Sequence, residues 1–183
     1  MIKAYHQGQI DYFCGIYAII NATRIATGAI PRFTYKQSCA FYQHLIQYLY
    51  DNNKFLDVLY HGTSLNLMDE LLAETQKYLF DTYGIHFHYK KILSYKRMSI
   101  SQLGNYISAY TNRPNTSCIV RTHSVEMGDH WTVAIGKKST ILGLFDSYFY
   151  KQIDLAQSTL RPYKRDNLNH IVRQGVILIK VLK

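Results

Sequence analysis

The chain of 183 residues has little of what stabilises a small extracellular domain or anchors a protein in a membrane. Its three cysteines, Cys14, Cys39 and Cys118, are odd in number and widely spaced, with no CxxC pair and no cysteine–histidine ladder for zinc. This pattern predicts a reducing compartment. The longest apolar runs fall well short of the roughly 20 residues that a membrane span needs. We therefore expect no membrane segment, no disulfide, no metal and no cofactor.

Signals that divide a chain into domains are also scarce. The sequence contains three prolines and has no repeat, no low-complexity stretch and no linker. A chain of this length can bury about 70% of its unfolded surface in one core, so we expect a single domain over residues 1–183. The N-terminus has no signal-peptide apolar core, which predicts a cytoplasmic protein, or one exported without an N-terminal signal.

Charge is distributed unevenly along the chain. Residues 1–89 hold six Lys/Arg and seven Asp/Glu, whereas residues 90–183 hold fifteen and five, so the net charge of +9 resides in the second half. A basic half can steer an acidic partner, so a protein or peptide substrate of acidic character is favoured. The seventeen tyrosines could accompany a nucleic-acid surface, but no known nucleic-acid-binding motif is visible, and nucleic acid is not predicted.

Helical patterns occupy much of the first 110 residues. The segment after Cys14 is apolar on more than one face, which indicates a buried helix that ends near Gly28. Ser64 and Gly84 fit the cap and the stop of a later helix, and Ser99 begins a capping box. The predicted helices cover residues 14–27, 37–50 and 64–84 and a segment that begins near residue 99.

Strand patterns alternate with and follow these helices. They cover residues 85–92, 117–122, 130–136, 140–146 and 176–182. The turn at residues 137–139 makes 130–146 an antiparallel hairpin. Helices first and a mainly antiparallel sheet later define the α+β class.

The most informative residue is Cys14, which the pattern places at the start of the first helix. Helix N-termini carry partial positive charge and unpaired backbone N–H groups, which favour a thiolate over a thiol. Gly15 beside it leaves space at the helix start. Cys39 and Cys118 lie within apolar helix and strand patterns and are predicted to be structural.

A base and its orienting group are expected on the hairpin. His130 opens one strand and Asp146 closes the next, so the two meet at the same end of the hairpin. The carboxylate can then accept the imidazole N–H and fix its tautomer. His123 is the competing base. Asp129 is a weaker orienting candidate because adjacent strand residues point to opposite faces.

Acyl transfer also needs donors for the developing oxyanion. The backbone N–H of Cys14 can supply one, and a glutamine amide from the preceding loop can supply the second. Gln7 and Gln9 both qualify by distance along the chain. Gln7 is preferred because Gly8 after it lets the backbone turn toward the site. His86 and His88 share a strand face, but no third ligand lies near them, so no metal site is predicted.

These residues resemble the papain-like cysteine peptidases, and most closely the bacterial C39-like members. The resemblance rests on Gln-Gly before Asp-x-x-Cys-Gly at a helix start, His-Trp opening a strand and Asp on the next strand. It covers residues 6–22 and 129–148 and implies a papain-like fold, a nucleophile at Cys14, a base at His130, an orienting Asp146 and an oxyanion donor at Gln7. The family glutamine usually lies six positions before the cysteine, where this chain has Gly8, so Gln9 stays an alternative.

Three functions follow in order of preference. The first is a thiol hydrolase that cleaves a peptide or isopeptide bond through an acyl-thioester. The second is an acyltransferase, similar to transglutaminases, that uses the same three residues. The third is a non-catalytic basic module that binds an acidic partner; it would tolerate Cys14→Ala but not charge reversal at Lys164 and Arg165.

Overall fold

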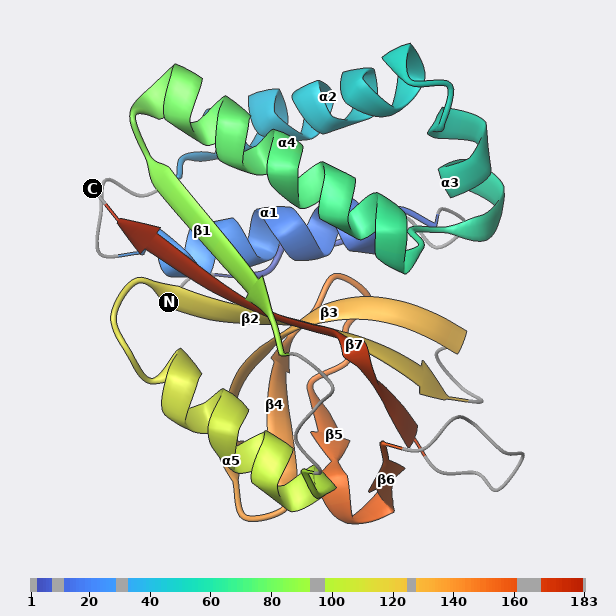
Figure 1. Ribbon diagram of the computed structural model, residues 1–183, viewed down its shortest axis with the longest axis vertical. Coiled ribbons are helices and arrows are strands. Elements are labelled where there is room, and N and C mark those ends of the chain that lie inside the picture. The colour runs from blue at the N-terminus through green and yellow to red at the C-terminus, as the bar shows by residue number, and fades with distance from the viewer. Residues whose placement is uncertain are drawn as a thin grey trace.

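The structure is a computed structural model that describes residues 3–7, 12–28, 33–92, 98–124, 128–160 and 169–182. These residues form helices and one mainly antiparallel sheet, the α+β class that the sequence predicts (Figure 1). The helices are α1 (Cys14–Ala26), α2 (Tyr35–Asp51), α3 (Phe55–His61), α4 (Leu65–Tyr83), α5 (Ile100–Thr111) and a short 3-10 helix η1 (Leu155–Gln157).

Side-chain caps set the starts of three helices. Thr34, Ser64 and Ser99 precede α2, α4 and α5, and each accepts a hydrogen bond from the backbone N–H three residues later. A glutamine completes a capping box in α2 and in α5. Gly84 ends α4 with a left-handed φ of 64°. The predicted boundaries of α4 and α5 are confirmed, whereas α3 was not predicted because seven residues carry too little periodicity.

The sheet has the strand order β1-β7-β2-β3-β4-β5, with β6 paired to β7. All pairs are antiparallel except β6 with β7. β7 is longer than predicted because it continues through a register shift beside β2, and the short β5 and β6 were not predicted. The strands are β1 (His86–Lys91), β2 (Thr116–Ser124), β3 (Gly128–Lys138), β4 (Ile141–Phe145), β5 (Gln152–Asp154), β6 (Ser158–Thr159) and β7 (Asn169–Leu182).

The predicted hairpin is the pair β3–β4. Val133 lies opposite Phe145, so continuing this register by one residue sets Asp146 opposite Thr132 and diagonal to His130. Diagonal residues on one sheet face are within reach of long side chains. The register therefore explains why the side chains of His130 and Asp146 can meet.

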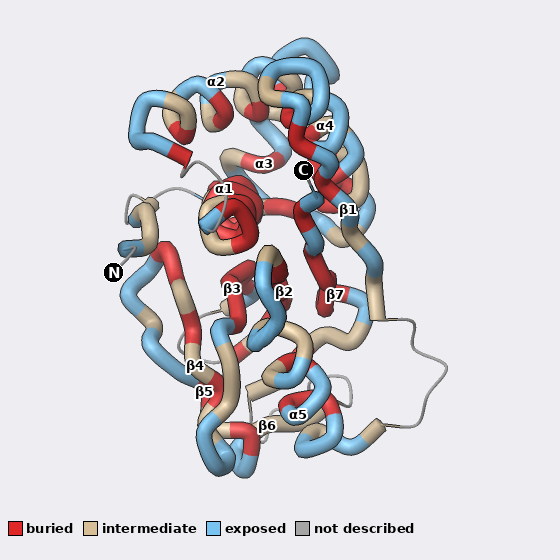
Figure 2. Tube along the Cα trace, turned by 90° about the vertical axis from the view of Figure 1, so that its left-hand side faces the viewer, coloured by how far each residue is buried: buried red, intermediate tan, exposed pale blue. Residues whose placement is uncertain are grey.

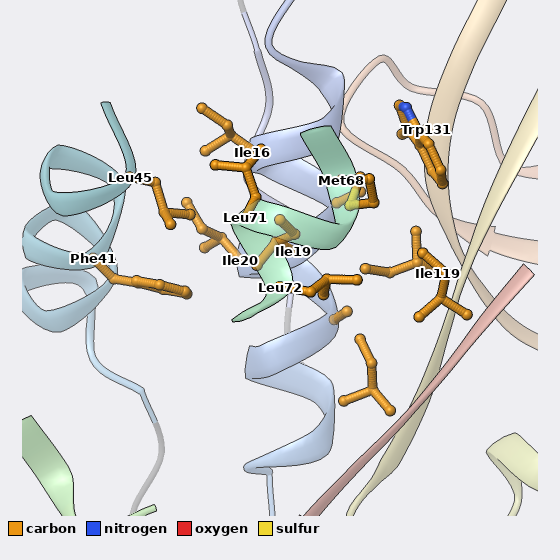
Figure 3. Close-up of a cluster of buried hydrophobic side chains, with 14 of the residues drawn as sticks. Ile16, Ile19, Ile20, Phe41, Leu45, Met68, Leu71, Leu72, Ile119 and Trp131 are labelled. Atoms are coloured by element: carbon orange, nitrogen blue, oxygen red, sulfur yellow. The ribbon is translucent and has the colours of Figure 1, made fainter. Parts of the chain in front are cut away.

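The central element of the molecule is α1, which lies between the other N-terminal helices and the sheet (Figure 2). Apolar side chains from α1, α2, α4 and the sheet interlock around it (Figure 3). A second cluster fills the space between the opposite sheet face and α5. The residues labelled in Figure 3 are Ile16, Ile19, Ile20, Phe41, Leu45, Met68, Leu71, Leu72, Ile119 and Trp131. Burial on all sides gives the start of α1 a fixed position against the sheet.

Candidate active site

Cys14 is the first residue of α1 and is 6% exposed. The N-cap position is Phe13, which makes no side-chain capping hydrogen bond, and the first turn contains no acidic residue. No carboxylate of that turn therefore neutralises the partial positive charge of the helix end.

The start of α1 is locked to the sheet through Thr63, which precedes α4. A Cβ atom on Gly15 would lie 2.4 Å from the Thr63 Oγ1 atom, and the Trp131 Nε1–H donates to the Thr63 carbonyl oxygen over 2.7 Å. The interpretation that Gly15 leaves open space beside the cysteine is therefore wrong. Its missing side chain lets Thr63 pack against the helix, and Thr63 in turn connects α1 to β3.

His130 connects the cysteine to the carboxylate. Its Nε2 atom lies 2.6 Å from the Asp146 Oδ1 atom, and the imidazole is also hydrogen-bonded to the side chain of Cys14. Because Nε2 is directed at the carboxylate, Nδ1 is the ring nitrogen that remains for the thiol. His130 and Asp146 are both buried, at 5% and 4% exposure. His130 thus interacts with both Cys14 and Asp146.

The electrostatics of the pair favour its charged form. Burial lowers the pKa of His130, but the hydrogen bonds and charges of Asp146 and Cys14 outweigh it and raise that pKa to about 9. Burial likewise raises the pKa of Asp146, yet its contact with His130 holds it below the usual range. At neutral pH the pair is therefore an imidazolium beside a carboxylate.

The second carboxylate oxygen of Asp146 is held by the backbone of the turn that follows β4. It accepts hydrogen bonds from the backbone N–H of Tyr148 over 2.7 Å and of Tyr150 over 3.3 Å. The Tyr150 ring also contacts the His130 ring edge-on, with the centroids 5.9 Å apart. Carboxylate orientation is thereby fixed from both sides.

Gln7 lies next to this turn. Its backbone N–H donates to the Ser147 carbonyl oxygen over 3.1 Å, and the Ser147 hydroxyl donates to its Oε1 atom over 3.2 Å. The amide oxygen of Gln7 therefore faces Ser147. Residues 3–7 are held along α1, where the Asn21 amide bonds both the N–H and the carbonyl of Tyr5 over 2.9 and 3.1 Å. Gln9, the alternative donor, lies outside the described residues.

The competing base belongs to a different cluster. The His123 Nδ1 atom lies 3.3 Å from the Asp129 carboxylate, and Arg121 forms a salt bridge with the same carboxylate at 3.2 Å. Neighbouring His170, opposite His123 on β7, has its pKa lowered by burial and by the positive charges beside it. Of the two histidines, His130 is thus the one that contacts Cys14 and Asp146. The Asp129 side chain is paired with residues of β2 instead.

The other two cysteines differ from each other. Cys118 is fully buried between the sheet and α5, and burial raises the pKa of its thiol. Cys39 is half-buried and lines a cavity between α1 and α2, so it is not enclosed in the core as its apolar pattern suggested. Within the described ranges, no group of three or more His, Cys, Asp or Glu side chains is arranged to hold a metal ion.

Sequence reasoning missed three supporting residues. Thr63 packs against the start of α1, Ser147 bonds Gln7, and Tyr150 contacts the His130 ring. The Asp-Ser turn after β4 was a visible signal for Ser147, because such pairs end strands. No pattern in the sequence pointed to Thr63, whose role depends on how α4 docks against α1.

Comparisons with protein-family models, with curated proteins and with solved structures give no match to this chain. None of the helices in the described part of the chain is both long enough and apolar enough to cross a membrane. Lys164 and Arg165, the residues named for a binding role, lie outside the described residues.

Proposed function

We propose that this protein is a cysteine hydrolase of the papain-like type, which cleaves a peptide or isopeptide bond through an acyl-thioester on Cys14. One observation carries the proposal: His130 is hydrogen-bonded to both Cys14 and Asp146 in a buried site. A nucleophile, a base and a group that orients the base are the parts that acyl transfer requires. A cysteine at the start of a central helix, packed on an antiparallel sheet, supports the resemblance to the bacterial C39-like peptidases.

The first half of the reaction acylates the enzyme. In the resting enzyme His130 Nδ1 already holds the Cys14 proton, and the sulfur attacks as a thiolate at the substrate carbonyl carbon to form a tetrahedral intermediate. The intermediate collapses, the carbon–nitrogen bond breaks, and the leaving amine takes its proton from His130. Asp146 stays ionised throughout and stabilises the imidazolium. The product of this half is a thioester on Cys14 and a free amine.

The oxyanion of the intermediate needs two donors. The backbone N–H of Cys14, at the first position of α1, supplies one. The Gln7 amide supplies the other, because Ser147 holds its oxygen and so directs its N–H bonds. Each donor is worth about 3 kcal/mol of transition-state stabilisation.

The second half regenerates the enzyme. His130, now neutral, takes a proton from water, and the hydroxide attacks the thioester carbonyl. The carbon–sulfur bond breaks, the acid leaves, and the sulfur returns to its pairing with the imidazolium. An amine in place of water would give the acyltransferase reaction, so acceptor-dependent products distinguish the two outcomes.

Acylation with a small activated ester tests the proposal without knowledge of the substrate. An acetyl p-nitrophenyl ester should release a burst of p-nitrophenolate and leave an acetyl group on Cys14, located by peptide mass mapping. Cys14→Ala should abolish the burst, and Tyr50→Ala, at an exposed position on α2, should leave it unchanged. Equal acylation of Cys14 and Cys39, or an undiminished burst in His130→Ala, would contradict the proposal.

A further inference from the structure

A tyrosine-lined cavity lies along the helix that begins at Cys14. It lies between residues 3–7, α1 and α2, and its volume is about 370 Å³. This volume is within the range of pockets that hold small ligands. Four aromatic rings from these three segments line it: Tyr5, Tyr17, Tyr35 and Tyr42. Nothing in the proposed reaction uses this cavity.

The rings form two pairs on a fixed frame. Tyr5 contacts Tyr35 edge-on with centroids 6.0 Å apart, and Tyr17 contacts Tyr42 with centroids 5.5 Å apart. The backbone of Tyr5 is held by the side-chain amide of Asn21 on α1. The aromatic walls are therefore supported by α1 and α2.

The position of the cavity relates it to the reacting atoms. Tyr17 follows Cys14 by three residues on α1, so it lies about 4.5 Å further along the helix and on a neighbouring part of its surface. On the other wall, His6 also lines the cavity and directly precedes Gln7, which bonds Ser147 beside the orienting carboxylate. An extended peptide advances about 3.3 Å per residue. A side chain in the cavity would thus be a few residues from the scissile bond.

The lining selects an uncharged ring. The described lining residues include no Asp, Glu, Lys or Arg. A tyrosine cage can hold an organic cation, but the Arg24 guanidinium already lies 3.7 Å from the centroid of the Tyr5 ring and would repel a second positive charge. Aromatic side chains pack well against edge-on and tilted rings.

We propose that this cavity is a specificity pocket that binds a neutral aromatic side chain of the substrate, Phe, Tyr or Trp. This proposal rests on the proposed function in so far as the bound side chain belongs to a substrate. The binding of an aromatic group to the cavity does not depend on catalysis. The two can therefore be tested apart.

Cys39 provides the readout, because it lines the cavity and is half-buried. The test measures its alkylation by iodoacetamide in Cys14→Ala, with and without N-acetyl-phenylalaninamide at about 10 mM, above the roughly millimolar Kd expected of so small a ligand. N-acetyl-leucinamide, N-acetyl-lysinamide and tetramethylammonium are the comparison probes. We expect about tenfold slower alkylation with the aromatic amide alone, because a ligand at about ten times its Kd leaves roughly one site in eleven empty.

Two variants locate the effect. Tyr42→Ala should abolish the protection, and Gln43→Trp, which fills the cavity from α2, should abolish it without removing a ring. Tyr50→Ala is the matched control, because Tyr50 is on the same helix, is 69% exposed and does not line the cavity. Circular dichroism checks that each variant is folded.

The outcomes separate the two proposals. Protection by the aromatic amide without any acylation of wild-type Cys14 would leave the pocket standing and refute the hydrolase. Acylation of Cys14 without protection of Cys39 would overturn the pocket. Protection by tetramethylammonium or the lysine amide, or equal protection by the leucine amide, would also overturn it. Peptide libraries should then show aromatic selection at one position, seen as at least about tenfold in kcat/KM.

Discussion

Replacing Asp146 with asparagine should remove the charge of the side chain while keeping its size and shape. One carboxylate oxygen accepts from His130 and the other accepts from the backbone N–H groups of Tyr148 and Tyr150. An amide of the same size has only one oxygen. If that oxygen keeps its hydrogen bond with the imidazole, the NH₂ group of the asparagine faces the two backbone N–H donors. If the amide is flipped, the NH₂ group faces the imidazole N–H instead.

The cost follows from this mismatch. A buried donor left without an acceptor costs about 1–3 kcal/mol, and loss of the charge–charge attraction adds to it. We expect Asp146→Asn to lower the free energy of unfolding by about 2–4 kcal/mol near neutral pH. The pKa of His130 should fall because burial then opposes its charge with less compensation.

Urea unfolding measures the first effect and NMR titration of the His130 ring measures the second. Asp129→Asn is the matched control, because its carboxylate lies on the adjacent part of β3 and its side chain is 57% exposed. It should cost under about 1 kcal/mol and leave the His130 titration in place. An unchanged His130 titration in Asp146→Asn, or equal losses in the two variants, would refute the reasoning.

Three further predictions follow from the same contacts. Gly15→Ala should destabilise the fold by about 1–3 kcal/mol, because its Cβ meets Thr63 at 2.4 Å; a Tm equal to that of wild type would contradict this packing. Ser147→Ala should lower kcat about fivefold with little change in KM, because the amide of Gln7 loses its hydrogen-bond donor; a change in KM alone would argue against an oxyanion role. Because the pKa of His130 is raised from 6.5 to about 9, the stability that its charged form contributes should be complete below pH 6.5 and be lost as the pH rises through about 9. The free energy of urea unfolding should therefore depend less on pH between these values in His130→Ala than in wild type. An identical pH dependence in the two proteins would contradict the raised pKa.

Local signals predicted much of the fold. Ser64, Gly84 and Ser99 marked helix ends correctly because caps act through hydrogen bonds within one turn. The β3–β4 hairpin was predictable because its turn and its two strands are contiguous in sequence. The long extension of β7 and the short α3 were missed, since the first is stabilised by pairing with β2 and the second is too short for a pattern.

The candidate site likewise combines residues that local sequence patterns predict with residues that only long-range packing brings together. Cys14 could be placed at a helix start, and His130 could be placed beside Asp146, from neighbouring residues alone. The contact of Thr63 with Gly15 and the cavity beside Cys39 required the packing of helices that are distant in sequence. Sequence therefore predicts which residues meet at the candidate site better than it predicts the residues that hold and surround them.

The central claim is that Cys14 and His130 act as a pair, and the alkylation rate of each cysteine against pH tests it most directly. The rates with iodoacetamide would be measured from about pH 4 to 9 in wild type and in His130→Ala, with Cys39 and Cys118 as internal references. The account predicts rapid reaction of Cys14 alone below about pH 7, lost in His130→Ala. A rate for Cys14 that matches Cys39 and rises only near about pH 8.5, as for an ordinary thiol, would contradict it.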